Sequence, residues 1–300
     1  MKKVLLAVAI TSAFASAAAT AATVYENDDT KLSIGGRAEV RGVFSDDFEG
    51  TMEDASRARI NFGGETKISE GLTGFGFMEY QLEPNSKMSN RYLYAGLGTT
   101  VGKFSYGKQD TSNVIISDMT DIASEHSGQQ QIIDASKDKQ ENTFLYQHTI
   151  ADMFTVNANY NAVDEKDGDS FGISGLASLD FGLDLGLAYS SEEDLDQITL
   201  GAAYTLDNLY LGATYATVDL DEGSFNSVEL AAEYKFTSEF RLIGIYGFAE
   251  HSKADEKDTD FFALEGQYRF NSSIRTYASY KIDNVKDANN ELMVGLRYNF

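Results

Sequence analysis

Three arginines, Arg37, Arg59 and Arg91, stand in runs where apolar and polar residues alternate, and each is assigned to the charged face of its run. Asp121 and Glu125 stand in a stretch where this alternation stops. On a sheet that crosses a membrane, a charged side chain facing lipid at mid-depth would cost about 2–4 kcal/mol. We therefore expect the arginines to face water, with the two acids as counter-charge.

Basic and acidic side chains that face each other across a narrow water layer produce a transverse electric field. Such a field orients dipolar solutes and rejects apolar ones, and rings of charge are a known means of selectivity in pores. A second interpretation stays open, in which the arginines form salt bridges that hold the acidic stretch against a wall. The two interpretations are compatible.

The acids lie in residues 109–138, which read QDTSNVIISDMTDIASEHSGQQQIIDASKD. A segment of this length without regular structure is uncommon in a compact domain unless it is functional. We expect it to fold into the lumen of a β-barrel, where it narrows a channel.

Alternating runs of about ten residues, the length that outer-membrane strands need, fill most of the remaining chain. In residues 57–68, RARINFGGETKI, apolar side chains take the even positions and charged or polar ones the odd positions. In residues 91–97 the same reading places Tyr92 and Tyr94 on the apolar face. The runs predict an all-β fold, a transmembrane antiparallel β-barrel of about 16 strands with an inward-folded constriction loop.

The connections between these runs differ on the two sides of the predicted barrel. One set is short, and the other is longer and acidic, at residues 45–55, 163–168, 218–224, 251–259 and 283–290. A soluble β-sandwich also alternates, but it needs fewer strands and bulkier core residues. The acidic loops, including Asp46, Asp47, Glu49, Glu53 and Asp54, predict either a plain solvated surface or an electronegative mouth that concentrates cations.

Residues 1–21 have the features of a signal peptide, so the expected domains are 1–21 and a barrel over 22–300, with 109–138 as its constriction loop. Lys2 and Lys3 precede an apolar run, and Ala19-Thr20-Ala21 is a small-residue cleavage site. The mean hydropathy of −0.30 would suit a soluble protein. A barrel with a wet lumen, however, shows its membrane band only at every second residue.

The chain carries 24 Lys and Arg against 47 Asp and Glu, and its net charge of −23 argues against nucleic acid as a partner. It has no cysteine, which excludes disulfides and thiolate sites. The three histidines lack metal-ligand spacing. Ser127 follows His126, but neighbouring loop residues do not by themselves create a nucleophile and its base. We expect no cofactor, no metal site and no enzymatic activity.

Three segments of the chain resemble the trimeric general porins of Gram-negative bacteria. They are ATVYENDDTKLSIGGRAEVRG, RARINFGGETKISEGLTGFGFMEY and NRYLYAGLGTTVGKFSYGKQD. The last strand, ELMVGLRYNF, ends in a phenylalanine that resembles the family's C-terminal assembly signal. The resemblance implies a homotrimer in the outer membrane, in contact with lipid and lipopolysaccharide, and a third loop that sets the narrowest point.

The resemblance also implies a set of constriction residues. Arg37, Arg59 and Arg91 match basic wall positions, and Lys139 falls near a further one. Thr120-Asp121 and Glu125 match the acidic side of the loop, although Ser124-Glu125-His126-Ser127-Gly128 replaces the family's Pro-Glu-Phe-Gly-Gly turn. The expected pore constriction therefore consists of Arg37, Arg59, Arg91, Lys139, Asp121 and Glu125.

The expected function is passive diffusion of small hydrophilic solutes and ions through a water-filled channel with a preference for cations. The alternative is a substrate-selective channel, for example for oligosaccharides. Such a channel would show an aromatic ladder, for which Tyr80 and Tyr106 are candidates, but the sequence does not group lumen-facing aromatics with the third loop. Short outer loops argue against a dedicated adhesin.

Overall fold

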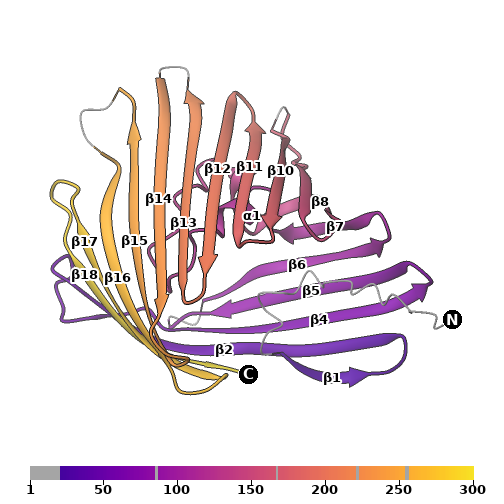
Figure 1. The fold of residues 1–300 in the computed structure, drawn as a ribbon, viewed down its shortest axis with the longest axis horizontal. Helices are drawn as coiled ribbons and strands as arrows, with labels where there is room; N and C mark the ends of the chain where they lie inside the picture. Colours follow the sequence, from indigo (N-terminus) through magenta and orange to yellow (C-terminus); the bar gives the residue numbers. More distant parts are fainter. Residues whose placement is uncertain (1–20, 85–86, 167, 221–222, 254–256) are drawn as a thin grey trace.

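The computed structural model describes residues 21–84, 87–166, 168–220, 223–253 and 257–300, and within these ranges the chain is a closed antiparallel barrel (Figure 1). Sixteen strands form the ring, each paired with the next along the chain. They are β2 (Thr30–Ser45), β4 (Arg57–Ser69), β5 (Leu72–Leu82), β6 (Met88–Thr99), β7 (Gly102–Gln109), β8 (Gln140–Ile150), β9 (Phe154–Asn161), β10 (Ser170–Leu179), β11 (Leu183–Glu192), β12 (Leu195–Leu206), β13 (Leu209–Leu220), β14 (Gly223–Lys235), β15 (Phe240–His251), β16 (Thr259–Arg269), β17 (Ile274–Asp283) and β18 (Glu291–Asn299). The predicted barrel is confirmed.

The ring closes where its last strand, β18, meets its first, β2. The pairing runs from Glu291 opposite Ser45 to Asn299 opposite Arg37. Just beyond it, Gly36 and Phe300 exchange two backbone hydrogen bonds of 2.9 and 3.0 Å. Two short strands, β1 (Ala22–Glu26) and β3 (Glu53–Asp54), add to β2. Apart from Ala21, the expected signal segment lies outside the described residues.

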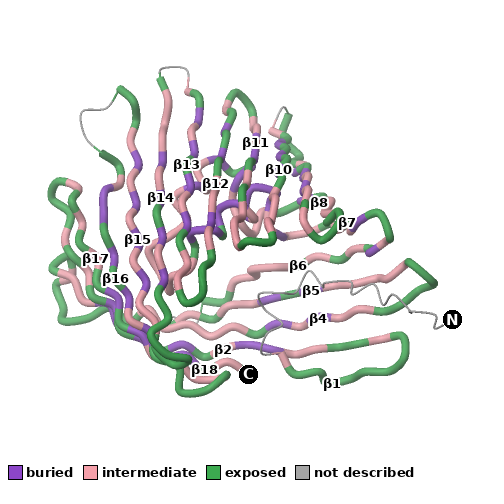
Figure 2. The backbone as a smooth tube through the Cα atoms, viewed as in Figure 1, coloured by how far each residue is buried: buried purple, intermediate pink, exposed green. Residues whose placement is uncertain are grey.

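Side chains alternate between the two faces of the wall, as the period of a β-strand requires. On β18, Leu292, Leu296 and Tyr298 are exposed outside, whereas Met293 and Arg297 are buried inside. Buried positions recur in the same way along the strands of Figure 2. The outer face is thus apolar and suits lipid, and the inner face is polar. Among the described residues, no helix is long and apolar enough to cross a membrane.

The short connections use residues that tolerate a left-handed backbone. Gly71 and Gly182 have φ of 75° and 88°, and glycine adopts this conformation without a steric penalty. The long connection expected over residues 218–224 is wrong, because β13 and β14 pair as far as Leu220 opposite Gly223. The hairpin extends beyond the apolar band of the wall. An acidic side chain such as Asp219 can stand on the strand there because it is exposed to water. Asp221 and Glu222 of that loop lie outside the described residues.

Residues 110–139, here called the inward segment, cross the interior of the barrel against the wall formed by β10 to β16. The segment contains α1 (Val114–Ser117) and the 3₁₀ turn η1 (Asp134–Ser136). Apolar contacts fix it at three places: Ile116 and Met119 against Ala188 and Ala203, Ile122 and Ala123 against Ile243, Ile245 and Phe261, and Ile133 and Ala135 against Val218. The segment therefore fills one side of the lumen.

Glycines on the inner face of the wall make room for this packing. A Cβ atom at Gly201 would lie 2.6 Å from both Ile116 Cγ2 and Met119 Sδ, closer than real side chains approach. Gly186 faces the same two side chains. The many small residues of these strands are therefore explained in part by the inward segment.

Candidate functional site

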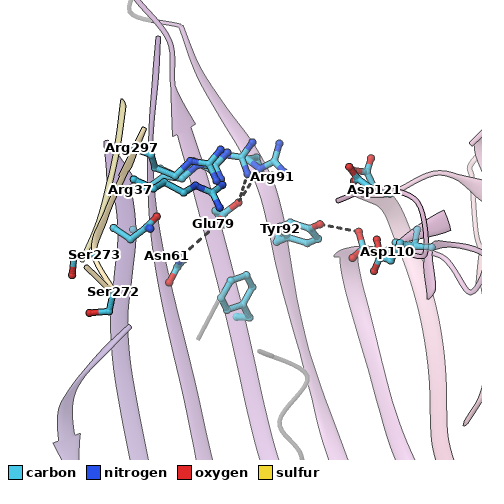
Figure 3. A pocket seen from close by; sticks show the side chains of 18 of the residues that line it. Arg37, Asn61, Glu79, Arg91, Tyr92, Asp110, Asp121, Ser272, Ser273 and Arg297 are labelled. Atoms are coloured by element: carbon cyan, nitrogen blue, oxygen red, sulfur yellow. Dashed lines mark hydrogen bonds and ion pairs between the residues drawn. The ribbon is translucent and has the colours of Figure 1, made fainter. Parts of the chain in front are cut away.

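A cavity of about 810 Å³ remains between the inward segment and the opposite wall. The wall contributes six arginines to its lining, and the inward segment contributes four aspartates. In Figure 3, Arg37, Arg91 and Arg297 lie on one side, and Asp110 and Asp121 lie on the other. The charged residues that line the cavity are Arg37, Arg59, Arg91, Arg275, Arg297, Asp110, Asp118, Asp121 and Asp138, together with Glu79 and Arg269.

The strand register brings the wall arginines together. Arg37 on β2 lies directly opposite Arg59 on β4, and Arg297 on β18 lies opposite Arg275 on β17. Directly opposed residues on one face are close neighbours, and like charges placed there repel. The arrangement therefore requires counter-charge or water around the guanidinium groups.

Glu79 on β5 supplies part of this counter-charge. Its Oε1 lies 2.8 Å from Arg91 Nε and 3.9 Å from Arg59 Nη1. The Glu79 side chain is 9% exposed, so it acts as a buried link between the two arginines. Sequence reasoning did not single out Glu79, although its position on the inner face follows from the alternation.

Arg91 reaches the cavity because of a β-bulge. The register between β5 and β6 shifts after the Glu79–Tyr92 pair, which leaves Arg91 as an extra residue. A bulge re-aims the side chain at this point. Regular alternation would have grouped Arg91 with Leu93, which is 53% exposed on the outer face. The expectation that Tyr92 and Tyr94 lie on the apolar face is therefore wrong, since both line the cavity.

Three aromatic rings on the inner face lie next to the charged residues. Phe77 packs against Tyr92 and Tyr94 at centroid distances of 6.1 and 5.7 Å. The Tyr92 hydroxyl donates a hydrogen bond of 2.9 Å to Asp110 Oδ1 on the inward segment. The statement that lumen-facing aromatics do not group with this loop is thus wrong. Tyr106, in contrast, is exposed on the outer face beside Phe144.

The aspartates of the inward segment lie close enough to influence one another. Asp118 faces the cavity, but the surrounding barrel displaces bulk water from it. This desolvation, followed by the charges of Asp110 and Asp121, raises the pKa of Asp118 to about 7. Desolvation also raises the pKa of Asp110. Asp121 accepts a hydrogen bond from the Ser127 hydroxyl.

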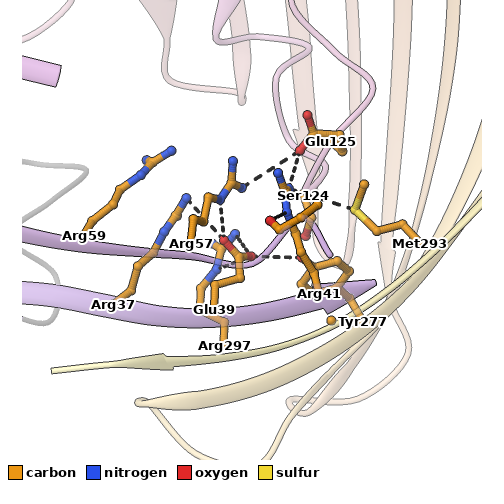
Figure 4. Close-up of polar contacts among 12 residues, drawn as sticks. Arg37, Glu39, Arg41, Arg57, Arg59, Ser124, Glu125, Tyr277, Met293 and Arg297 are labelled. Carbon is orange, nitrogen blue, oxygen red and sulfur yellow. Dashed lines mark hydrogen bonds and ion pairs between the residues drawn. The ribbon is translucent and has the colours of Figure 1, made fainter. Parts of the chain in front are cut away.

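Glu125 does not line the cavity. Its Oε2 lies 2.5 Å from Arg41 Nη1 and 3.9 Å from Arg57 Nη2 (Figure 4). The contact joins the inward segment to β2 and β4. Of the expected constriction residues, the structure places Arg37, Arg59, Arg91 and Asp121 around the cavity, and Glu125 beside it.

Lys139 does not line the cavity either. Its ammonium group forms an ion pair with Asp138, and its backbone N–H donates a hydrogen bond of 3.1 Å to Asp110. Desolvation, followed by the charge of Arg91, lowers the pKa of Lys139 to about 8. Lys139 therefore affects the cavity through Asp110 and Asp138.

Glu39 is the centre of a second group of charges on the wall (Figure 4). Its carboxylate is fully buried and lies 2.5 Å from Arg297, 2.7 Å from Arg57 and 3.5 Å from Arg37. The Tyr277 hydroxyl donates a further hydrogen bond of 3.0 Å to it. One carboxylate thus holds three guanidinium groups in place.

Two buried carboxylates on the opposite wall hold the inward segment by its backbone. Glu265 on β16 accepts hydrogen bonds from the N–H and the hydroxyl of Ser124, at 3.1 and 3.0 Å. Glu229 on β14 accepts bonds from the N–H groups of Gly128 and Gln129, at 3.3 and 3.4 Å. These bonds fix the tip that carries Glu125.

The described histidines do not form a recognisable catalytic arrangement. His126 Nε2 lies 3.3 Å from Glu291 Oε1, and the neighbouring Ser127 hydroxyl is bonded to Asp121 instead of His126. Within the part of the chain that the structure describes, no group of three or more His, Asp or Glu side chains is placed to hold a metal ion.

Comparisons with known proteins agree with the barrel. The family model described as Gram-negative porin matches residues 5–288. The chain is 31% identical to Porin-like protein L of Photobacterium profundum and 30% identical to Outer membrane protein U of Vibrio parahaemolyticus, over all of both chains in each case. Among solved structures, OmpF of Salmonella typhi superposes with a TM-score of 0.81 at 22% identity, covering 92% of this chain and 99% of that one. OmpT of Vibrio cholerae, in a trimer form, gives 0.76 at 19% identity, covering 91% and 100%.

Proposed function

The chain belongs to the Gram-negative porin family, and on that premise we propose that its charged cavity is the constriction of a general diffusion channel. The protein is a non-enzymatic channel of the Gram-negative outer membrane, as expected from the sequence. The observation that carries the proposal is the placement of arginines and aspartates on opposite sides of one 810 Å³ cavity.

In this proposal the inward segment limits the size of the solutes that pass, and the charges of the cavity select polar solutes over apolar ones. The segment occupies the side of the lumen along β10 to β16, so a solute passes between it and the arginine wall. The field between the wall and Asp118 and Asp121 aligns a dipolar solute and disfavours an apolar one. Replacing Asp121 by Asn should change the reversal potential in a salt gradient, and an unchanged value would contradict this role.

We further propose a modest preference for cations, to which the acids of the outer mouth contribute together with those of the cavity. Asp46, Asp47, Glu49, Glu53 and Asp54 are all exposed in one outer connection. Charge of one sign at a mouth raises the local concentration of the opposite ion. A reversal potential directed to the cation in a KCl gradient supports the proposal, and one directed to chloride contradicts it.

The expected homotrimer remains a proposal for this chain, supported by the trimer form of OmpT. Ala38 and Val40 are exposed on the outer face of β2 and are small enough for close packing against another barrel. Gly42 lies on the same face of the strand, but a Cβ atom there would meet Met52, so the outer connection covers this position. Cross-linking in native membranes tests the oligomeric state.

The aromatic patch of Phe77, Tyr92 and Tyr94 favours a second candidate, a channel that prefers sugars. Aromatic faces bind sugar rings, and these three line the cavity. Titrating maltotriose into an open channel distinguishes the two candidates. Saturable block favours the sugar channel, and unhindered current favours general diffusion.

A further inference from the structure

One sector of the cavity wall, on β17, β18 and β2, carries more positive charge than its carboxylates neutralise. Arg275 on β17 lies directly opposite Arg297 on β18, and Arg37 follows on the next strand, opposite Asn299. All three side chains line the cavity. We call Arg37, Arg275 and Arg297 the arginine sector.

The buried carboxylates near this sector are already shared. Glu39 contacts Arg297, Arg57 and Arg37, and it also accepts the Tyr277 hydrogen bond. Within the described ranges, no carboxylate lies within ion-pair distance of Arg275. Arg275 is therefore a guanidinium group on the cavity wall without an acidic partner.

Two nitrogen atoms of the sector have no hydrogen-bond partner. The Nε atoms of Arg37 and Arg275 are both buried and unbonded among the described residues. A buried donor without an acceptor costs about 1–3 kcal/mol. These shielded Nε atoms do not themselves face the cavity, but the guanidinium groups that carry them line it, and an anion that enters the cavity would compensate their positive charge.

The chemistry of the sector favours an anion with several oxygens and more than one charge. Guanidinium groups bind phosphate and carboxylate with paired hydrogen bonds, and phosphate offers three terminal oxygens. Ser272, Ser273 and Asn299 line the same cavity and add polar groups beside the arginines. The cavity of about 810 Å³ admits a small organic phosphate.

We propose that the arginine sector is an anion subsite, which transiently holds the phosphate group of small phosphomonoesters as they pass through the channel. Arg59 and Arg91, which share Glu79, are not needed for it. The inference rests on the proposed open channel and adds a solute class to it. Binding must stay weak, because a solute that conducts must also leave.

The test uses glycerol 3-phosphate added to KCl during single-channel recording of the mature protein, with glycerol as the neutral control. We expect glycerol 3-phosphate, but not glycerol, to reduce the conductance in a saturable way. Arg275→Gln should raise the half-blocking concentration about tenfold, since it removes a hydrogen bond between charged groups. Arg275→Lys keeps the charge and should retain most of the block.

Arg241→Gln is the matched control, because Arg241 is a wall arginine paired with Glu233 at 2.5 Å and does not line this cavity. Its block should equal that of the unchanged protein. Open channels that glycerol 3-phosphate does not block, or equal block in Arg275→Gln and the unchanged protein, overturn the subsite and leave the general channel intact. A folded barrel that passes no KCl current overturns the proposed function, and the subsite with it.

Discussion

Glu125 Oε2 lies 2.5 Å from Arg41 Nη1, and this contact ties the tip of the inward segment to the first strand of the ring. The Arg41 side chain is 11% exposed, so its charge is largely removed from water. Arg41 Nε also donates a hydrogen bond of 2.6 Å to the Ala55 carbonyl oxygen. The arginine therefore joins the inward segment, the wall and an outer connection.

Replacing Glu125 by Gln should weaken the fold more than it changes selectivity. The change leaves the largely buried Arg41 without its carboxylate, and we expect the free energy of unfolding in detergent to fall by about 1–2 kcal/mol. The reversal potential should move less than in Asp121→Asn, because Asp121 lines the cavity and Glu125 does not. Glu141→Gln is the control, since Glu141 pairs with Lys108 but is 74% exposed. A larger selectivity change in Glu125→Gln than in Asp121→Asn would refute this assignment.

The cation preference should fall as the pH is lowered from 8 to 6. Desolvation and the neighbouring acids raise the pKa of Asp118 to about 7, so its carboxylate is mostly charged above that pH and mostly neutral below it. Protonation removes negative charge from the cavity while the arginines remain positive. Asp118→Asn should reduce this pH dependence, which reversal potentials at the two pH values measure. Asp134→Asn is the control, because Asp134 does not line the cavity. Equal pH dependence in Asp118→Asn and the unchanged protein would contradict this role of Asp118.

Removing the carboxylates that hold the inward segment should enlarge the pore. In the double variant Glu229→Ala, Glu265→Ala, the N–H groups of Ser124, Gly128 and Gln129 lose their acceptors. The tip then moves more freely, and we expect larger polyethylene glycols to enter and reduce the conductance. Glu233→Ala is the control on the same wall, because Glu233 binds Arg241 and Lys235 instead of the segment. An unchanged polymer cut-off in the double variant would show that other contacts fix the segment.

Filling the space beneath α1 should destabilise the barrel. In Gly201→Val the new side chain meets Ile116 and Met119, and overpacking of this kind costs about 1–3 kcal/mol. Urea unfolding followed by gel mobility measures the loss. Gly175→Ala is the control, because no atom lies within 4 Å of a Cβ there. If Gly201→Val is as stable as the control, the inward segment does not pack as described.

The alternation of residue types was sufficient to predict the barrel, because each strand is two-sided and a charged residue on the lipid face is costly. It placed Arg37 and Arg59 correctly on the inner face of the wall. The alternation gave the wrong face for Tyr92, because a β-bulge shifts the inward–outward alternation of the strand by one residue. The types of the residues around the bulge do not indicate it.

The acidic side of the cavity was harder to predict for a different reason. The inward segment has no period that relates sequence position to direction, so Asp110, Asp118 and Asp138 could not be distinguished from other acids. Their positions depend on contacts distant in sequence, such as Ile116 against Ala188 and Ser124 against Glu265. Glu125 was expected at the constriction, but its position depends on its ion pair with Arg41, a residue distant in the sequence.

Planar-bilayer recording of the refolded mature protein in a KCl gradient tests the central claim, that the charged cavity is an open and ion-selective constriction. The account predicts stepwise openings in groups of three with a reversal potential directed to the cation, and a shift of that potential in Asp121→Asn. A folded, heat-modifiable barrel that passes no current would contradict it, because the inward segment would then close the lumen.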